Sequence, residues 1–152
     1  EPEPQRPGPG PGGQAPAEGR REAAEAAVAA LGRLCRLQAG SLGGLEAHLQ
    51  RFLSGLPLVE DLDQAGPTHE LLLDFVLEGH PFFQQHAARV CCVLLEVYDR
   101  ETSSERLNSG IRQVLLQTGR ERLQRMQPPL SPRQRRRLER ILRDAAPRAG
   151  SA

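Results

Sequence analysis

The sequence predicts an all-α protein, folded as a single irregular bundle or a short helical-hairpin array of five or six helices behind a disordered N-terminal tail. Three observations predict this class. Apolar residues recur at intervals of three and four along most of the chain, which is the period of a helix with one buried face. Gly, Pro and capping residues separate these stretches from one another. A length of 152 residues is typical of a single domain. Because only 3% of the residues are aromatic and none is Trp, the core must consist mainly of aliphatic side chains.

The two ends of the chain have a different composition from its middle. Residues 1–19 consist, apart from Arg6, of Pro, Gly, Glu, Gln and Ala. Such a segment cannot bury enough apolar surface to offset the entropy lost on ordering, so we expect it to be disordered. The helical domain is expected over residues 20–146, followed by a second disordered tail over residues 147–152.

Residues 20–38 are rich in Ala and predict the first helix. An apolar stripe at alternating threes and fours runs through this helix and beyond it. The stripe comprises Val28, Leu31, Cys35, Leu42, Leu45, Leu49, Phe52 and Leu56. Interior Gly residues each cost about 1 kcal/mol relative to Ala, so Gly40, Gly43 and Gly44 favour two helices. We expect Gly40 to end the first helix and Ser41 to cap the second. The stripe then belongs to the core, and coiled-coil dimerisation is the alternative.

Residues 55–67 predict a solvated acidic loop. Its apolar side chains are expected to pack on the core and hold the loop there. These side chains are Leu56, Leu58, Val59 and Leu62. Thr68 is expected to cap a short helix over residues 69–78.

Residues 81–100 form the most apolar stretch of the chain and predict a central helix. One stripe comprises Phe83, Ala87, Val90, Leu94 and Val97, and other sides carry Phe82, Cys91, Val93, Leu95 and Tyr98. A helix that is apolar around most of its girth is buried, so we expect the other helices to pack around it. With the helix before it, this stretch resembles the helical hairpin of an armadillo- or HEAT-type unit, although the chain shows no repeat of fixed period.

Two capping boxes, T-S-S-E and S-P-R-Q, predict two further helix starts. Thr102 is expected to cap a helix that Gly119 splits or ends. The apolar positions of this helix are Leu107, Ile111, Val114, Leu115, Leu123 and Met126. Ser131 is expected to cap the last helix, an amphipathic and Arg-rich segment over residues 132–146.

Charge is divided unevenly along the chain. Residues 37–99 hold nine acidic residues and two Arg, a local charge of −7, whereas residues 100–152 hold thirteen Arg and five acidic residues, a local charge of +8. All twenty basic residues are Arg. Such asymmetry is typical of a chain whose basic end binds a partner.

Sequence motifs for catalysis are missing. The sequence contains no G-x-x-x-x-G-K-[ST], G-x-G-x-x-G or C-x-x-C motif, and its His and Cys residues lack metal-ligand spacing. We therefore expect no enzyme activity, cofactor, metal or small-molecule substrate. The sequence has three Cys residues, Cys35, Cys91 and Cys92. Because this number is odd, we expect free thiols and not a disulfide framework, and hence a reducing compartment. No apolar run is long enough to span a membrane, so a nuclear or cytoplasmic protein is expected.

These observations favour a non-catalytic interaction subunit or adaptor, which docks on an acidic protein surface through apolar helix faces and the Arg-rich helix. The candidate contacts are Arg133, Arg135, Arg136, Arg137, Arg140 and Arg143. The alternative is a nucleic-acid-binding protein that contacts the phosphate backbone with the same residues. Base stacking is disfavoured because no aromatic residue follows Tyr98. Ser131, which Pro132 follows, is a candidate phosphorylation site that would reduce the local positive charge.

Overall fold

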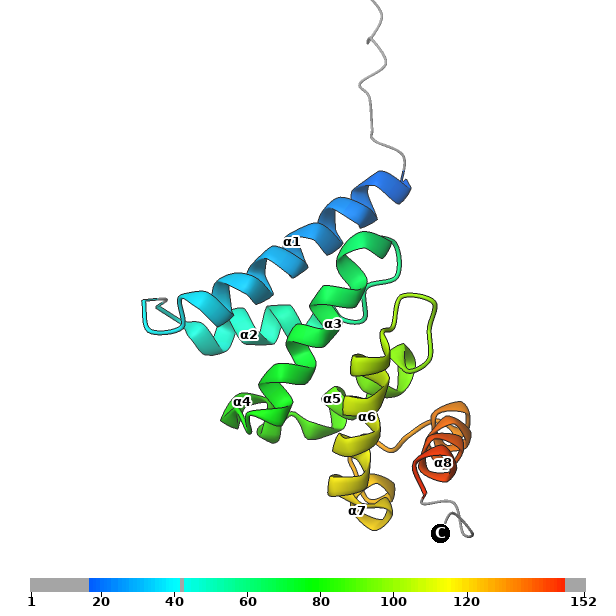
Figure 1. Ribbon diagram of the computed structural model, residues 1–152. Helices are drawn as coiled ribbons and strands as arrows, with labels where there is room; N and C mark the ends of the chain where they lie inside the picture. Colours follow the sequence, from blue (N-terminus) through cyan, green and yellow to red (C-terminus); the bar gives the residue numbers. More distant parts are fainter. Residues whose placement is uncertain (1–16, 42, 147–152) are drawn as a thin grey trace, which may run out of the picture.

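The computed structural model describes residues 17–41 and 43–146, and these residues contain eight helices and no strand (Figure 1). The all-α class is confirmed. The helices are α1 (Ala17–Leu37), α2 (Leu45–Ser54), α3 (Leu62–Leu77), α4 (Pro81–Gln85), α5 (Ala87–Val97), α6 (Glu105–Thr118), α7 (Arg120–Gln124) and α8 (Pro132–Ala145). The first helix begins at Ala17, three residues before the expected boundary at residue 20, so the prediction of disorder was wrong for residues 17–19. The rest of the two predicted tails, residues 1–16 and 147–152, lies outside the described residues.

The helices pack in an array that runs from α1 to α8 (Figure 1). The α1–α2 hairpin lies at one end, and α3 crosses it. Helix α6 packs against α3, and α8 packs against α5 and α6 at the opposite end. The basic last helix is therefore at the edge of the molecule, far from the α1–α2 hairpin.

Helix α5 is buried on nearly every side, as the sequence predicts. Its buried residues are Val90, Cys91, Val93, Leu94, Leu95 and Val97. The predicted continuous helix over residues 81–100 is wrong, however, because His86 divides it into α4 and α5. The ring of His86 stacks on that of Phe82 at a centroid distance of 4.3 Å, and its Nδ1 lies 2.8 Å from the carbonyl oxygen of Phe82. Since a carbonyl oxygen only accepts, Nδ1 is the donor, and this local bond accompanies the change of direction between α4 and α5.

Helix α3 begins at Leu62, although a loop was predicted over residues 55–67 and a helix only from residue 69. The prediction overlooked a local cap, Asp61, and a distant side chain that holds the segment before the helix. The carboxylate of Glu25, in α1, accepts hydrogen bonds from the backbone N–H groups of Val59, Glu60 and Asp61 at 2.8, 2.9 and 2.7 Å. Asp61 then caps α3 by accepting from the N–H of Gln64 at 3.1 Å.

Pro67 lies inside α3 and not at its start. A proline there removes one intrahelical hydrogen bond, and the helix tolerates this loss within its packed surroundings.

The four apolar side chains that were predicted to attach this segment to the core behave differently from one another. Leu56 and Leu58 are buried as expected, whereas Val59 and Leu62 are 51% and 61% exposed and do not attach the segment to the core.

Burial opposes the charged form of Glu25, but its three backbone hydrogen bonds outweigh burial and lower the pKa of this carboxyl group. Glu25 is therefore ionised at neutral pH. The connection between α2 and α3 is held by a charge-assisted set of bonds to α1.

Three of the four predicted helix caps were assigned to the wrong residue. Thr68 lies inside α3, which Asp61 caps. Helix α2 is preceded by Gly44, in a left-handed conformation with φ 69°, and not by Ser41. Helix α6 is capped by Ser104, whose hydroxyl accepts from the N–H of Leu107 at 3.0 Å, and not by Thr102. The fourth cap, Ser131, is confirmed. The errors at α2 and α6 are shifts of a few residues within a run of plausible capping residues, whereas the error at Thr68 follows from the missed first part of α3.

The apolar stripe of α1 and α2 packs inside the chain, as the core interpretation predicts. Cys35, Leu49, Phe52 and Leu56 are buried, and Val28, Leu31 and Leu45 are half-buried against the same core. Leu42 lies outside the described residues. Coiled-coil dimerisation would need this stripe on the surface, so the stripe does not support it.

Helices α1 and α2 approach closely at Gly32. A Cβ at this position would lie 2.4 Å from Cε2 and 2.8 Å from Cδ2 of Phe52, a side chain that is 0% exposed. The absence of a side chain at Gly32 therefore sets the distance between the two helices.

Gly32→Ala should lower the free energy of unfolding by about 1–3 kcal/mol, because the new methyl group overpacks the Phe52 ring. This loss should occur although Ala is the better helix former by about 1 kcal/mol. Gly19→Ala is the control in the same helix, since a Cβ there meets no atom within 4 Å. It should be neutral or stabilising by up to about 1 kcal/mol. Urea denaturation measures both, and effects of equal sign and size would contradict the packing described.

His69 is a buried titratable residue, with only 1% of its surface exposed. Its Nε2 accepts from the N–H of Leu58 at 3.0 Å, which requires the proton on Nδ1. Nδ1 has no hydrogen-bond partner among the described residues. Burial, assisted by the charge of Arg100 and opposed by that of Glu25, lowers the pKa of His69 from 6.5 to about 4.

The free energy of unfolding should fall as the pH drops from 7 to 5. In this window the unfolded chain binds a proton at His69 with an ordinary pKa, whereas the folded chain, with a pKa of about 4, does not. The loss should reach about 2 kcal/mol at pH 5, at about 1.36 kcal/mol per pKa unit. His69→Gln keeps an acceptor for Leu58 and should reduce this decline. An equal decline in both proteins, measured by urea denaturation at each pH, would show that another group is responsible.

Candidate protein-interaction surfaces

Helix α8 has a well-defined start and a single buried face. The hydroxyl of Ser131 accepts from the N–H of Gln134 at 3.1 Å, and the N–H of Ser131 donates to the Oε1 of Gln134 at 2.9 Å. Pro132 occupies the first helical position, where its missing N–H removes no bond. Leu138 and Ile141 are buried against the body of the protein. The apolar face of α8 is therefore used within the fold, and its charged face is the one available to a partner.

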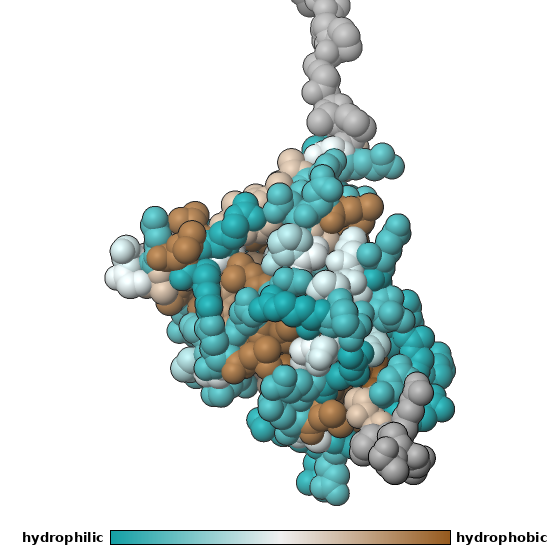
Figure 2. Space-filling model, in the orientation of Figure 1, coloured by the Kyte–Doolittle hydropathy of each residue, from teal (hydrophilic) through white to brown (hydrophobic). Residues whose placement is uncertain are grey.

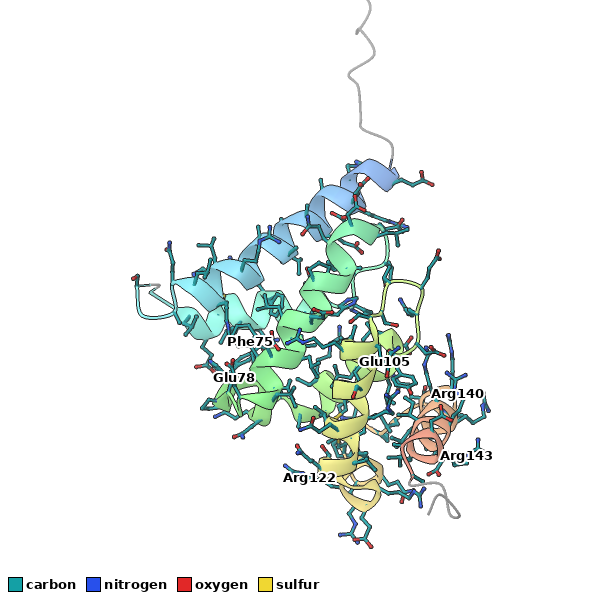
Figure 3. The ribbon with its side chains drawn as sticks, viewed as in Figure 1. Phe75, Glu78, Glu105, Arg122, Arg140 and Arg143 are labelled. Carbon is teal, nitrogen blue, oxygen red and sulfur yellow. The ribbon has the colours of Figure 1, made fainter. Side chains whose placement is uncertain are left out.

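Five of the six Arg residues predicted on α8 are exposed. They are Arg133, Arg135, Arg136, Arg140 and Arg143. Four of these recur at intervals of three and four, at positions 133, 136, 140 and 143, and so form one stripe along the helix. None of the five side chains forms an ion pair or hydrogen bond with the described part of the chain. Figure 3 shows Arg140 and Arg143 on α8 at the edge of the molecule.

Arg137 is the exception among the six. Its side chain is half-buried, and one Nη donates to the carbonyl oxygen of Tyr98, just after α5, at 2.7 Å. Burial, followed by repulsion from Arg140, Arg100 and Arg133, lowers the pKa of Arg137, while Glu96 opposes this shift. Arg137 therefore attaches α8 to the end of α5, and in this structure its guanidinium is engaged within the fold.

Many Arg side chains outside α8 pair with acidic residues, most of which lie in the middle of the chain. Arg106 contacts Glu70 at 3.0 Å and Asp74 at 2.6 Å, and joins α6 to α3. Arg36 pairs with Glu78, which Figure 3 shows at the lower end of α3. Further pairs are Arg21–Glu60, Arg100–Glu96, Arg112–Glu105 and Arg120–Glu139. The uncompensated positive charge of the described residues is therefore concentrated on α7 and α8.

A groove between α3, α4, α5, α6 and α7 was not predicted from the sequence. It consists of two adjoining hollows of about 350 and 720 Å³ that share Ala87, Thr118 and Arg122. The smaller hollow is lined by Val76, Phe83, Gln84, Ala87, Val90, Cys91, Val114, Thr118 and Arg122. Figure 2 shows apolar surface, in brown, between the lower part of α3 and α6. Sequence periodicity marked most of these residues as core, and only their assembly from several helices leaves a gap between them.

The thiols lack the features of a catalytic nucleophile. Burial raises the pKa of Cys91 to about 12, and burial also raises the pKa values of Cys35 and Cys92. A thiol with a raised pKa contains little of the reactive thiolate at neutral pH. Residues 17–41 and 43–146 contain no group of three or more His, Cys, Asp or Glu side chains that could hold a metal ion. Among the same residues, no helix is long and apolar enough to cross a membrane.

Comparison of the chain with protein-family models, with curated proteins and with solved structures finds no match. The functional proposal therefore depends on the surfaces of the chain itself.

Ser131 is exposed and remains a candidate phosphorylation site beside the start of the Arg stripe. Ser131→Ala removes the cap and should cost about 0.5–2 kcal/mol of stability. Ser131→Asp keeps an acceptor at the cap and adds a negative charge. It should leave the free energy of unfolding unchanged and weaken the binding of an acidic partner. Thermal denaturation and binding measurements separate these effects. If both variants bind such a partner like the parent protein, Ser131 is only a helix cap.

Proposed function

We propose that this protein is a non-catalytic interaction subunit, or adaptor, of a larger intracellular assembly in the nucleus or cytoplasm. It docks through α8 onto the acidic surface of a partner protein. The observation that carries this proposal is the exposed stripe at positions 133, 136, 140 and 143, whose guanidinium groups have no acidic partner in the described part of the chain. Elsewhere in the same chain Arg residues commonly have such partners.

The stripe is unfavourable for the isolated protein. Like charges three or four residues apart on a helix destabilise it by about 0.2–0.5 kcal/mol per pair. Carboxylates of a partner would remove this repulsion and replace it with favourable ion pairs. The guanidinium group suits this role because its planar fork binds a carboxylate through two parallel hydrogen bonds. Because Leu138 and Ile141 are already buried, the contact made by α8 itself is mainly ionic and should weaken as salt increases.

The test replaces the stripe without changing the buried face of α8. In the quadruple variant Arg133→Gln, Arg136→Gln, Arg140→Gln and Arg143→Gln, the stripe loses four charges and keeps residues of similar helix propensity. The tagged protein is purified from cells at its endogenous level. Neighbours are identified by carboxylate-directed crosslinking and mass spectrometry, since the sequence has no Lys. We expect the parent protein to recover a stoichiometric partner with crosslinks to acidic segments, and the variant to lose it.

Arg51→Gln is the matched control, because Arg51 is an exposed residue of α2 at the other end of the array. It should recover the same partner as the parent protein. Circular dichroism should show unchanged helix content in both variants. Recovery of the parent protein only as a free monomer would contradict the proposal, and so would a partner that the quadruple variant retains in full.

The alternative function, nucleic-acid binding, uses the same exposed stripe. All four Phe residues and Tyr98 are at most 6% exposed, so none of these rings is available to stack on a base. Binding would then be limited to contacts between guanidinium groups and phosphates. A gel-shift series with duplex DNA and RNA tests this alternative, because such binding should weaken steeply between about 50 and 200 mM salt. No shift at the lower salt concentration would eliminate it.

A further inference from the structure

The groove between α3 and α6 has an apolar floor and a basic rim. Val90 and Cys91 of α5 lie at its base, and Val76 of α3 and Val114 of α6 line it from either side. The volume of the smaller hollow, about 350 Å³, falls within the range of about 300–1,000 Å³ typical of sites that enclose a ligand. Such a hollow can receive one or two large apolar side chains.

The rim of the groove is positively charged where it continues along α7. Arg120, Arg122 and Arg125 line the larger hollow together with a single acidic residue, Glu121. Arg120 is paired with Glu139 of α8 at 2.9 Å. Arg122 and Arg125 are exposed, and neither forms an ion pair with another described residue. In Figure 3, Arg122 lies beside the lower end of α6, on the side opposite to Arg140 and Arg143.

We infer that this groove binds an acidic amphipathic helix of a partner protein. The helix would insert Leu or Phe side chains between Val76 and Val114 and place its carboxylates against Arg122 and Arg125. The inference rests on the proposed interaction function and adds to it a second site, distinct from the α8 stripe. A helix laid in a groove buries its apolar face at intervals of three and four residues, and the apolar floor beside two unpaired Arg residues complements that pattern.

Charge complementarity selects this occupant over the others. A basic amphipathic helix would bring like charges to Arg122 and Arg125, which is costly at a rim facing a low-dielectric hollow. A nucleic acid could pair with the two Arg residues but would leave the apolar floor unfilled. A peptide with both apolar and acidic faces satisfies both parts of the groove.

The experiment uses a fluorescein-labelled probe of about 16 residues, because shorter helices are marginal in water. Leu occupies one face of the probe and Glu the remainder. Fluorescence anisotropy should show saturable binding below about 200 µM. A scrambled peptide of the same composition, and a peptide with Arg in place of Glu, should each bind at least about tenfold more weakly. Binding of the scrambled peptide with equal affinity would overturn the inference, and so would no binding of the probe.

Variants locate the site. Arg122→Glu with Arg125→Glu should weaken probe binding at least about tenfold, whereas Arg51→Glu should change it less than about twofold. Val76→Gln should also weaken binding, and Leu77→Gln, at an exposed neighbour outside the groove, should not. If all four variants bound the probe with equal affinity, the groove would be excluded as its binding site.

A measurement on the parent protein does not depend on the folding of any variant. Methyl NMR spectra with the probe should show shifts concentrated at Val76, Val90 and Val114. Shifts centred on Leu138 and Leu142 would assign the probe to α8 and overturn the inference. The quadruple α8 variant should bind the probe like the parent protein. Failure of the α8 proposal is therefore distinguishable from failure of the groove.

Discussion

The burial of α5 is the constraint on which the rest of the structure depends. A helix that is apolar on nearly every side cannot face water, so α4, α6 and α8 must pack around it. Both candidate surfaces follow from this arrangement. Leu138 and Ile141 hold α8 on the body, Arg137 binds the carbonyl oxygen of Tyr98 at the end of α5, and the charged face of α8 is left outside. Where the covering helices leave a gap, the buried face of α5 becomes the floor of the groove.

The net charge is only +1, but the Arg residues differ in whether they form ion pairs within the protein. Arg36 and Arg106 pair with acidic residues in α3 and directly after it, and so connect neighbouring helices. Exposed pairs of this kind contribute little to stability individually, but they compensate much of the acidic charge of the middle of the chain. The Arg residues of α7 and α8 have fewer acidic neighbours, so their charge is available to a partner. Among the described residues, the Arg-rich part of the sequence therefore divides into a first set that forms ion pairs, Arg100, Arg106, Arg112 and Arg120, and a later set, from Arg122 to Arg143, that forms none.

The two surfaces are suited to different tasks. An exposed stripe of charge accelerates encounter with an acidic partner and orients it, whereas an apolar groove can hold a small number of buried anchor side chains that supply most of the binding energy. They lie on different sides of α6, so one partner could contact both only by extending around this end of the array (Figure 3). Two partners could otherwise be bound at once, which is the arrangement expected of an adaptor.

The sequence by itself determined the all-α class, the apolar positions of α5 and α6, the cap at Ser131 and the basic face of α8. These features depend on periodicity and on contacts a few residues apart, which the local sequence contains. Only the tertiary structure decided how the segment before α3 is held, because Glu25 accepts hydrogen bonds from the N–H groups of Val59 and Asp61 across more than thirty residues. The tertiary structure alone also shows that Gly32 packs against Phe52 and that Arg137 donates a hydrogen bond to the carbonyl oxygen of Tyr98. In the same way, only the structure shows that residues from five helices line a groove. Each of these depends on distances between helices, and helical periodicity specifies which face of a helix is buried but not which neighbour buries it.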